Sequence, residues 1–180
     1  AGYSRSDERE ADEQGFILTN KAGFNPYSML ITVSKLQDLA DAKGNPGFGL
    51  FSTHPEPEVR KERVNKSLAK MNITPTVAMA EDGTATVQDG NWQFVINQTY
   101  NSDKPEYRAK LMAGALYLVK KRGPVDETRF LTVDDSYFSD IYYEDIHILR
   151  VYEQDAVGYD SISSYAGAVA ARLQNWALRK

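Results

Sequence analysis

TVAMAEDGTATVQDGNWQFVIN, residues 76–97, is the stretch that decides the fold class. Short runs of alternating apolar and polar side chains are separated here by two turn signals, Asp82-Gly83 and Asp89-Gly90. An Asp-Gly pair between such runs is typical of a tight β-hairpin, because glycine adopts the positive φ that the turn needs. The stretch therefore predicts a three-stranded meander, with strands over 76–80, 84–88 and 91–97.

The residues before this meander repeat their apolar side chains at helical spacing instead. Gly23 stands where a left-handed C-terminal cap is expected, and Asn25-Pro26 is a typical start, with asparagine as N-cap and proline at the first helical position. Helices are predicted over 6–21, 25–43 and 56–71. A narrow seam on the first helix consists of Ala11, Gly15, Leu18 and Ala22.

Helices and strands also alternate after the meander. We predict a helix over 105–122 that Gly123-Pro124 closes, strands over 129–133 and 145–152, and a terminal helix over 160–178. The sequence thus indicates an α+β fold with two parts. Residues 1–72 form an N-terminal helical segment, and residues 73–180 form a small antiparallel or mixed sheet domain with two helices.

The segment VDDSYFSDIYYEDI, residues 133–146, has two interpretations. It is either a polar loop between strands that also sends aromatic side chains into the core, or an acidic and aromatic surface for a basic peptide or partner. A calcium loop is disfavoured, because the EF-hand spacing and its glycine are missing.

Composition excludes several classes of function. The formal charge of −4 and the pI near 5.3 argue against a broad surface for nucleic acid or anionic membranes. The sequence contains no cysteine, which excludes disulfides, thiolate zinc sites and cysteine nucleophiles, so any metal must be bound by His, Asp or Glu. We also expect no transmembrane segment, because a run of about 18 apolar residues is missing.

Two carboxylates near the start of the first helix form the motif EREAD. Glu8 and Asp12 stand four residues apart, and like charges at that spacing destabilise a helix by roughly 0.2–0.5 kcal/mol. Either this face is hydrated, where carboxylates suit the positive end of the helix dipole, or a cation belongs there. Ala11 and Gly15 on the same face would allow another helix to approach closely, which suits a buried metal ligand.

The loop FSTHPEPEVRKERV, residues 51–64, contains one of the two histidines of the chain. A single histidine in a loop is most often a surface residue or a satisfied hydrogen-bonding group. The surroundings of His54 are less ordinary, because Pro55 and Pro57 stiffen the backbone and Arg60 follows within the next helix. An arginine at this place can pair with a carboxylate and fix the loop.

In this order, EREAD, KAGFNPYSML and LFSTHPEPEVRKER resemble the downstream half of the metallopeptidase family that includes the CAAX prenyl endopeptidase and the heat-shock protease HtpX. The resemblance covers roughly residues 4 to 66 and implies an incomplete zincin-like domain of a zinc endopeptidase. It implies that Glu8 is the third zinc ligand, that Asp12 supports the ligands from the second shell, and that His54 and Arg60 close the catalytic site. Zinc is the implied cofactor, and the implied partner is a peptide or protein substrate.

The sequence departs from this family in one respect. The HExxH motif, which supplies two zinc-binding histidines and the general base, is absent. His147, the other histidine, lies in a predicted strand, where we expect a structural role. We therefore expect this chain to be the C-terminal part of a longer zinc peptidase, inactive alone, with HExxH on an upstream fragment that stays bound. The alternative is a non-catalytic binding module derived from such a peptidase. Members of the family with soluble catalytic domains favour an exported or cell-envelope location.

Overall fold

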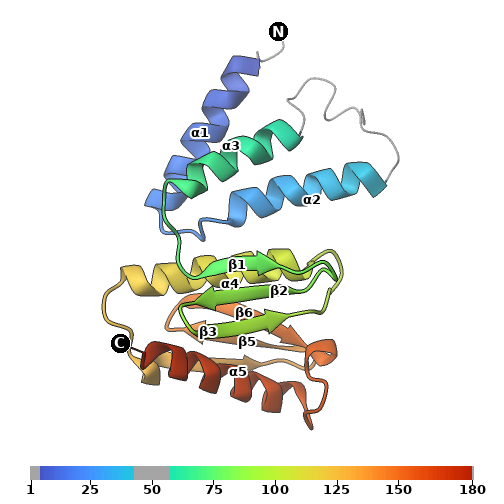
Figure 1. Ribbon diagram of the computed structural model, residues 1–180, viewed down its shortest axis with the longest axis vertical. Coiled ribbons are helices and arrows are strands. Elements are labelled where there is room, and N and C mark those ends of the chain that lie inside the picture. The colour runs from blue at the N-terminus through green and yellow to red at the C-terminus, as the bar shows by residue number, and fades with distance from the viewer. Residues whose placement is uncertain (1–4, 43–56, 180) are drawn as a thin grey trace. The chain divides into compact units, whose positions relative to one another are not determined.

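The computed structural model describes residues 5–42 and 57–179, apart from the side chains of Arg5, Glu8 and Pro57. The chain divides into two compact units, unit 1 (Ala1–Ile73) and unit 2 (Thr74–Lys180). Unit 1 contains the first three helices, and unit 2 contains two small antiparallel sheets with two further α-helices (Figure 1). The predicted α+β fold class is therefore confirmed.

Unit 1 contains α1 (Arg5–Lys21), α2 (Ser28–Ala42) and α3 (Pro57–Ala69). Gly23 takes a φ of +79° after α1, as the predicted left-handed cap requires. Helix α2 begins later than predicted. The Asn25 carbonyl accepts a hydrogen bond from the Ser28 N–H, and its Oδ1 accepts one from the Tyr27 N–H at 3.0 Å, so a turn precedes the helix.

The core of unit 1 differs from the predicted seam. Phe16 is the buried side chain of α1, whereas Leu18 is 62% exposed and nothing lies within 4 Å of the position that a Cβ on Gly15 would take. The seam is thus open within the described part of the chain. Among the described residues of unit 1, the buried hydrophobic side chains are Phe16, Leu30, Ile31, Val33, Ala40, Val64, Leu68 and Ile73.

The first sheet of unit 2 is the predicted meander of β1 (Thr76–Met79), β2 (Ala85–Asp89) and β3 (Trp92–Ile96). Gly83 and Gly90 take positive φ at its two turns, as the Asp-Gly pairs require. Val87 pairs with Phe94 across β2 and β3, and both side chains are buried. The meander prediction is confirmed.

The second sheet contains β4 (Phe130–Asp134), β5 (Phe138–Tyr143) and β6 (Ile146–Tyr152). The loop interpretation of 133–146 is wrong for residues 138–143, because β5 is the central strand of this sheet. Its polar residues are paired instead of solvated. Ser139 donates to Asp134, and Asp140 accepts from Arg150 on the neighbouring strand.

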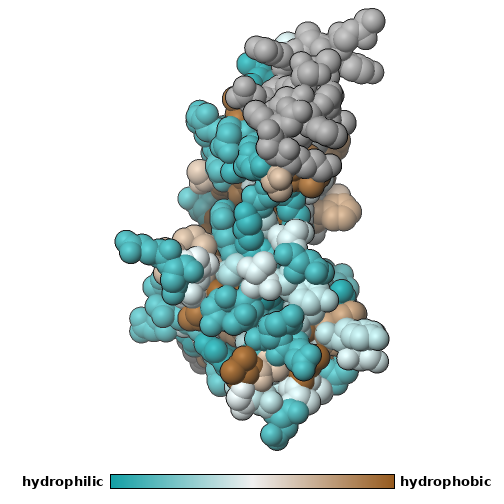
Figure 2. Space-filling view, turned by 90° about the vertical axis from the view of Figure 1, so that its right-hand side faces the viewer, coloured by the Kyte–Doolittle hydropathy of each residue, from teal (hydrophilic) through white to brown (hydrophobic). Residues whose placement is uncertain are grey.

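Two helices cover the sheets of unit 2. Helix α4 (Pro105–Lys121) packs on the first sheet and on β6, and α5 (Ile162–Ala177) packs on the second sheet. Short 3-10 turns, η1 (Glu127–Arg129) and η2 (Glu153–Asp155), follow α4 and β6. Hydrophilic side chains cover most of the face of unit 2 seen in Figure 2, with separate hydrophobic spots between them.

None of the helices in the described ranges combines the length and the apolar character that crossing a bilayer requires.

Candidate functional site

An ion pair between Asp12 and Arg60 joins α1 to α3. Arg60 Nε donates to Asp12 Oδ2 at 2.9 Å, and Arg60 Nη2 donates to Asp12 Oδ1 at 2.8 Å. The Asp12 side chain is 13% exposed and the Arg60 side chain is 26% exposed, so most of the contact is shielded from water. This bidentate geometry is the strongest form of arginine–carboxylate contact and fixes both groups in orientation. The pairing of Arg60 with a carboxylate, predicted from the sequence, is present.

This ion pair does not locate the other two predicted site residues, Glu8 and His54. Glu8 lies within α1, one helical turn before Asp12, but its side chain is outside the described part of the molecule. His54 falls in 43–56, which also lies outside the described residues. The structure therefore brings together two of the four residues, and the roles predicted for all four stay predictions.

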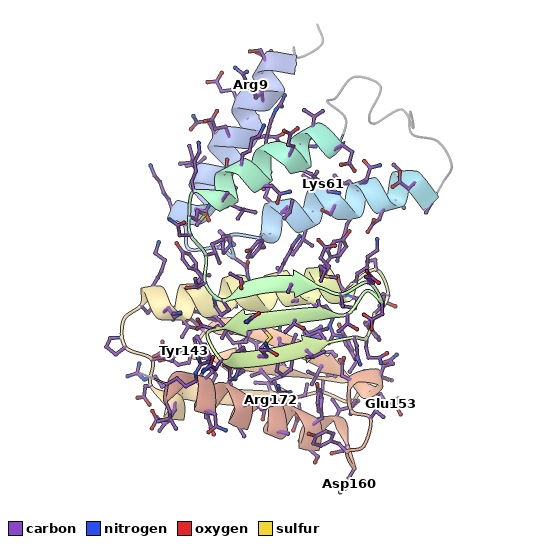
Figure 3. All side chains as sticks on the ribbon, viewed as in Figure 1. Arg9, Lys61, Tyr143, Glu153, Asp160 and Arg172 are labelled. Atoms are coloured by element: carbon purple, nitrogen blue, oxygen red, sulfur yellow. The ribbon has the colours of Figure 1, made fainter. Side chains whose placement is uncertain are left out.

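A cavity of about 200 Å³ opens between α1 and α3 beside this ion pair. Its apolar lining comes from the buried side chains of Phe16 and Val64. Figure 3 shows Arg9 on α1 and Lys61 on α3, the two helices that enclose it. The residues that line the cavity are Arg9, Asp12, Glu13, Phe16, Arg63, Val64, Lys66 and Ser67.

Arg63 is the lining residue that the sequence interpretation missed. Its Nη1 atom is buried and has no hydrogen-bond partner in the described parts of the chain. A buried N–H donor without a partner is costly, so this atom suits a carboxylate or carbonyl oxygen as its partner. The sequence held one signal for it, because Arg63 follows Arg60 by three residues and so lies on a neighbouring position of the helix surface.

The donor groups do not fit a complete zinc site. Over residues 5–42 and 57–179, no group of three His, Cys, Asp or Glu side chains is placed to hold a metal ion. Both oxygens of Asp12 already accept hydrogen bonds from Arg60, which suits a supporting carboxylate better than a ligand. A closed or catalytic zinc site needs at least three protein ligands, and this sequence has no cysteine and two histidines.

The second histidine lies in a different polar cluster in unit 2. His147 Nε2 lies 2.8 Å from Asp140 Oδ1, and Arg150 donates to both oxygens of the same carboxylate. Burial raises the pKa of Asp140, but hydrogen bonds from Arg150 and His147 outweigh it, so the pKa lies below its ordinary value. The Arg150 guanidinium also lies over the Phe138 ring at 3.6 Å. His147 is thus part of a hydrogen-bonded cluster around a buried carboxylate, which fits the predicted structural role.

One comparison with known proteins gives a match. The model of peptidase family M48 matches residues 1–68. No curated protein and no solved structure matches the chain. The matched segment contains α1, α2 and most of α3, and therefore both residues of the Asp12–Arg60 pair. Residues 1–68 are thus similar to peptidase family M48, which supports a metallopeptidase-type function for this part of the chain.

Proposed function

We propose that unit 1 supplies the downstream part of a zinc metalloendopeptidase site, which hydrolyses peptide bonds in peptide or protein substrates. Glu8 is the third zinc ligand in this proposal, and Asp12 is the supporting carboxylate. The observation that carries it is the bidentate contact between Asp12 and Arg60, which lie 48 residues apart. The match of residues 1–68 to the M48 family supports it at the level of the family.

Asp12 and Arg60 act in this proposal by positioning their neighbours. Arg60 holds the Asp12 carboxylate at a fixed place one turn after Glu8, so the direction in which Asp12 presents its remaining lone pairs is set in advance. Supporting groups of this kind typically change metal affinity or activity by roughly 10–100-fold.

The proposal also needs two zinc-binding histidines and a general base, and residues 1–180 contain no HExxH motif that would supply them. We propose that an HExxH segment supplies them, either upstream in the same polypeptide or on a fragment that stays bound, and that this chain alone is inactive. The open side of α1 supports such a contact, because Leu18 is 62% exposed and Gly15 has free space above it. An exported or cell-envelope location belongs to the same proposal.

The second candidate function is a non-catalytic binding module derived from such a peptidase. The two candidates differ in what must accompany the chain. A peptidase needs a polypeptide with HExxH and a metal, whereas a binding module needs neither.

Intact-mass spectrometry and zinc quantification on one preparation of the natural protein test this proposal. A polypeptide that contains HExxH, in the same chain or bound to it, with about one zinc per complex, is the expected result. A species that consists of residues 1–180 alone and binds no zinc when it is supplied would refute the peptidase and favour the binding module.

A further inference from the structure

The second sheet of unit 2 has one open edge, which lies along β4. The Asp135 N–H donates to the Phe138 carbonyl at 2.9 Å, and the Glu144 N–H donates to the Arg129 carbonyl at 3.2 Å, at the two ends of the β4–β5 ladder. Hydrogen-bonded and non-hydrogen-bonded pairs alternate between antiparallel strands. The backbone N–H and C=O groups of Phe130, Thr132 and Asp134 therefore point away from β5, along the edge.

Exposure agrees with an open edge. All residues of β4 after Phe130 are exposed, including Thr132 and Asp134, whose side chains lie on the face that α5 covers. On the other face Leu131 is 43% exposed and Val133 is 52% exposed. The strand contains neither lysine nor proline, the residues with which natural edge strands commonly avoid further pairing.

At the opposite edge of the same sheet, a buried side chain contacts the backbone of β6. Arg108 is 6% exposed, and its Nη2 atom donates to the Arg150 carbonyl of β6 at 3.0 Å. The same guanidinium donates to Asp155 and to the Gln98 carbonyl. Among the described residues, no side chain makes such a contact with the outward backbone groups of β4.

An acidic cavity of about 590 Å³ adjoins the far end of β4. Asp135, which follows the strand, lines it together with Glu153 and Asp160. The Ser163 hydroxyl at the start of α5 donates to Asp134 at 2.6 Å, which fixes the last residue of β4 beside this cavity. Figure 3 shows Glu153 and Asp160 toward one end of unit 2 and Tyr143, the partner of the first residue of β4, toward the other.

The described part of the chain provides no cationic partner for the three carboxylates of this cavity. Among the described residues, neither Lys nor Arg forms an ion pair with Asp135, Glu153 or Asp160. Hydroxyl groups from Ser136, Ser161 and Ser163 complete the polar lining. A cavity with this charge and these acceptors suits a Lys or Arg side chain.

We propose that unit 2 binds an extended peptide, which adds to β4 as a further strand and places a Lys or Arg side chain in the acidic cavity. Backbone hydrogen bonds to Phe130, Thr132 and Asp134 supply affinity that is independent of sequence. Specificity comes from two sources. Alternate apolar side chains of the peptide pack against Leu131 and Val133, and the basic residue meets Asp135, Glu153 and Asp160. This inference does not rest on the peptidase proposal, because it concerns unit 2 alone.

Fluorescence anisotropy with short synthetic peptides tests the proposal on the full chain. The probe has alternating valine and threonine, a fluorescein at one end and two lysines at the other. Two control peptides differ from it by glutamates in place of the lysines or by N-methylation of alternate backbone nitrogens. We expect the lysine peptide to bind, and each control to bind about tenfold more weakly, as the loss of one or two hydrogen bonds or ion pairs implies.

Matched variants locate the site. Thr132→Pro removes an outward N–H without breaking the β4–β5 ladder and should weaken binding about tenfold, whereas Thr132→Val keeps that N–H and should bind normally. Glu153→Gln with Asp160→Asn should remove the preference for the lysine peptide over the glutamate peptide. Glu81→Gln, on the exposed turn between β1 and β2, should leave that preference unchanged.

Amide hydrogen exchange on the unmodified chain provides a test that does not depend on whether a variant folds. Addition of the lysine peptide should slow exchange at Thr132 and Asp134, and leave the exposed amides of β1 unchanged. The proposal is overturned if none of the peptides binds, if Thr132→Pro remains folded and binds as well as Thr132→Val, or if bound peptide leaves exchange along β4 unaltered.

Discussion

Asp12 and Arg60 lie 48 residues apart in the sequence and meet through two parallel hydrogen bonds of 2.9 and 2.8 Å between α1 and α3. This contact joins the helix of the EREAD motif to the helix that follows the Thr-His-Pro segment. Because a small helical unit has a limited apolar core, a partly buried ion pair of this geometry is a substantial part of what holds α1 in place.

Arg60→Ala should therefore destabilise unit 1. It leaves the Asp12 carboxylate, 13% exposed, without its partner, and we expect the free energy of unfolding to fall by about 1–3 kcal/mol. Denaturation followed by circular dichroism measures this change. Glu58→Ala is the matched control, because it breaks an exposed pair on α3 and should change stability by less than about 0.5 kcal/mol. Equal losses of stability in Arg60→Ala and Glu58→Ala would show that the Asp12–Arg60 pair does not stabilise unit 1.

Arg108→Ala should destabilise unit 2 more strongly. The substitution removes a buried guanidinium and leaves Asp155, 7% exposed, as an uncompensated charge, with an expected cost of about 3–5 kcal/mol. Fluorescence of Trp92 and Trp176, which both lie in unit 2, follows this unfolding. Arg129→Ala, whose side chain is 54% exposed, should cost less than about 1 kcal/mol. A small loss of stability in Arg108→Ala would show that the hydrogen bonds of its guanidinium do not hold the second sheet in place.

The Asp140 cluster should make unit 2 sensitive to acid. The folded pKa of Asp140 lies below its ordinary value of 3.8, so its ionised form contributes stability above about pH 4, and this contribution is lost as the pH falls through the folded pKa. The difference in stability between the natural protein and Asp140→Asn should therefore shrink between about pH 5 and pH 2. Denaturant titrations across this range measure it, with Glu81→Gln as the control. A stability difference that stays constant across this pH range would contradict the lowered pKa of Asp140.

Two glycines should respond in opposite directions to alanine. Gly90 has a φ of +57°, and an added Cβ would lie 2.8 Å from Arg179 Nη2, so Gly90→Ala should cost about 1 kcal/mol. Gly167 lies within α5 with open space above it, so Gly167→Ala should raise stability by about 0.5–1 kcal/mol. Thermal unfolding of both variants distinguishes them, and shifts of the same sign would be inconsistent with the backbone geometry.

The sequence predicted the elements that carry local signals. Gly23 marked the end of α1, and Asp-Gly pairs marked the meander, because each signal acts within a few residues. Strand β5 was missed because Ser139 and Asp140 look like loop residues until Asp134 and Arg150 on the neighbouring strands pair with them. In the same way, the start of α2 depended on a turn that Asn25 can form as readily as an N-cap.

The features of the candidate sites also divide into those that the sequence predicts and those that only the packed structure reveals. Ordered motifs led to Asp12 and Arg60, since their spacing within each motif is visible in the sequence. Arg63 and the open edge of β4 could not be found this way, because both depend on which groups lack a partner after the helices and strands have packed. Burial and hydrogen bonding between distant segments decide such features.

The central proposal is that Glu8 binds zinc. The most direct measurement is the zinc content of the natural protein, together with any HExxH polypeptide bound to it, for Glu8→Gln and for the control Glu10→Gln on the same helix. Our account predicts about one zinc per molecule in the natural protein and in Glu10→Gln, and loss of most of that zinc in Glu8→Gln. Equal zinc content in both variants, or no zinc in the natural protein, would contradict it.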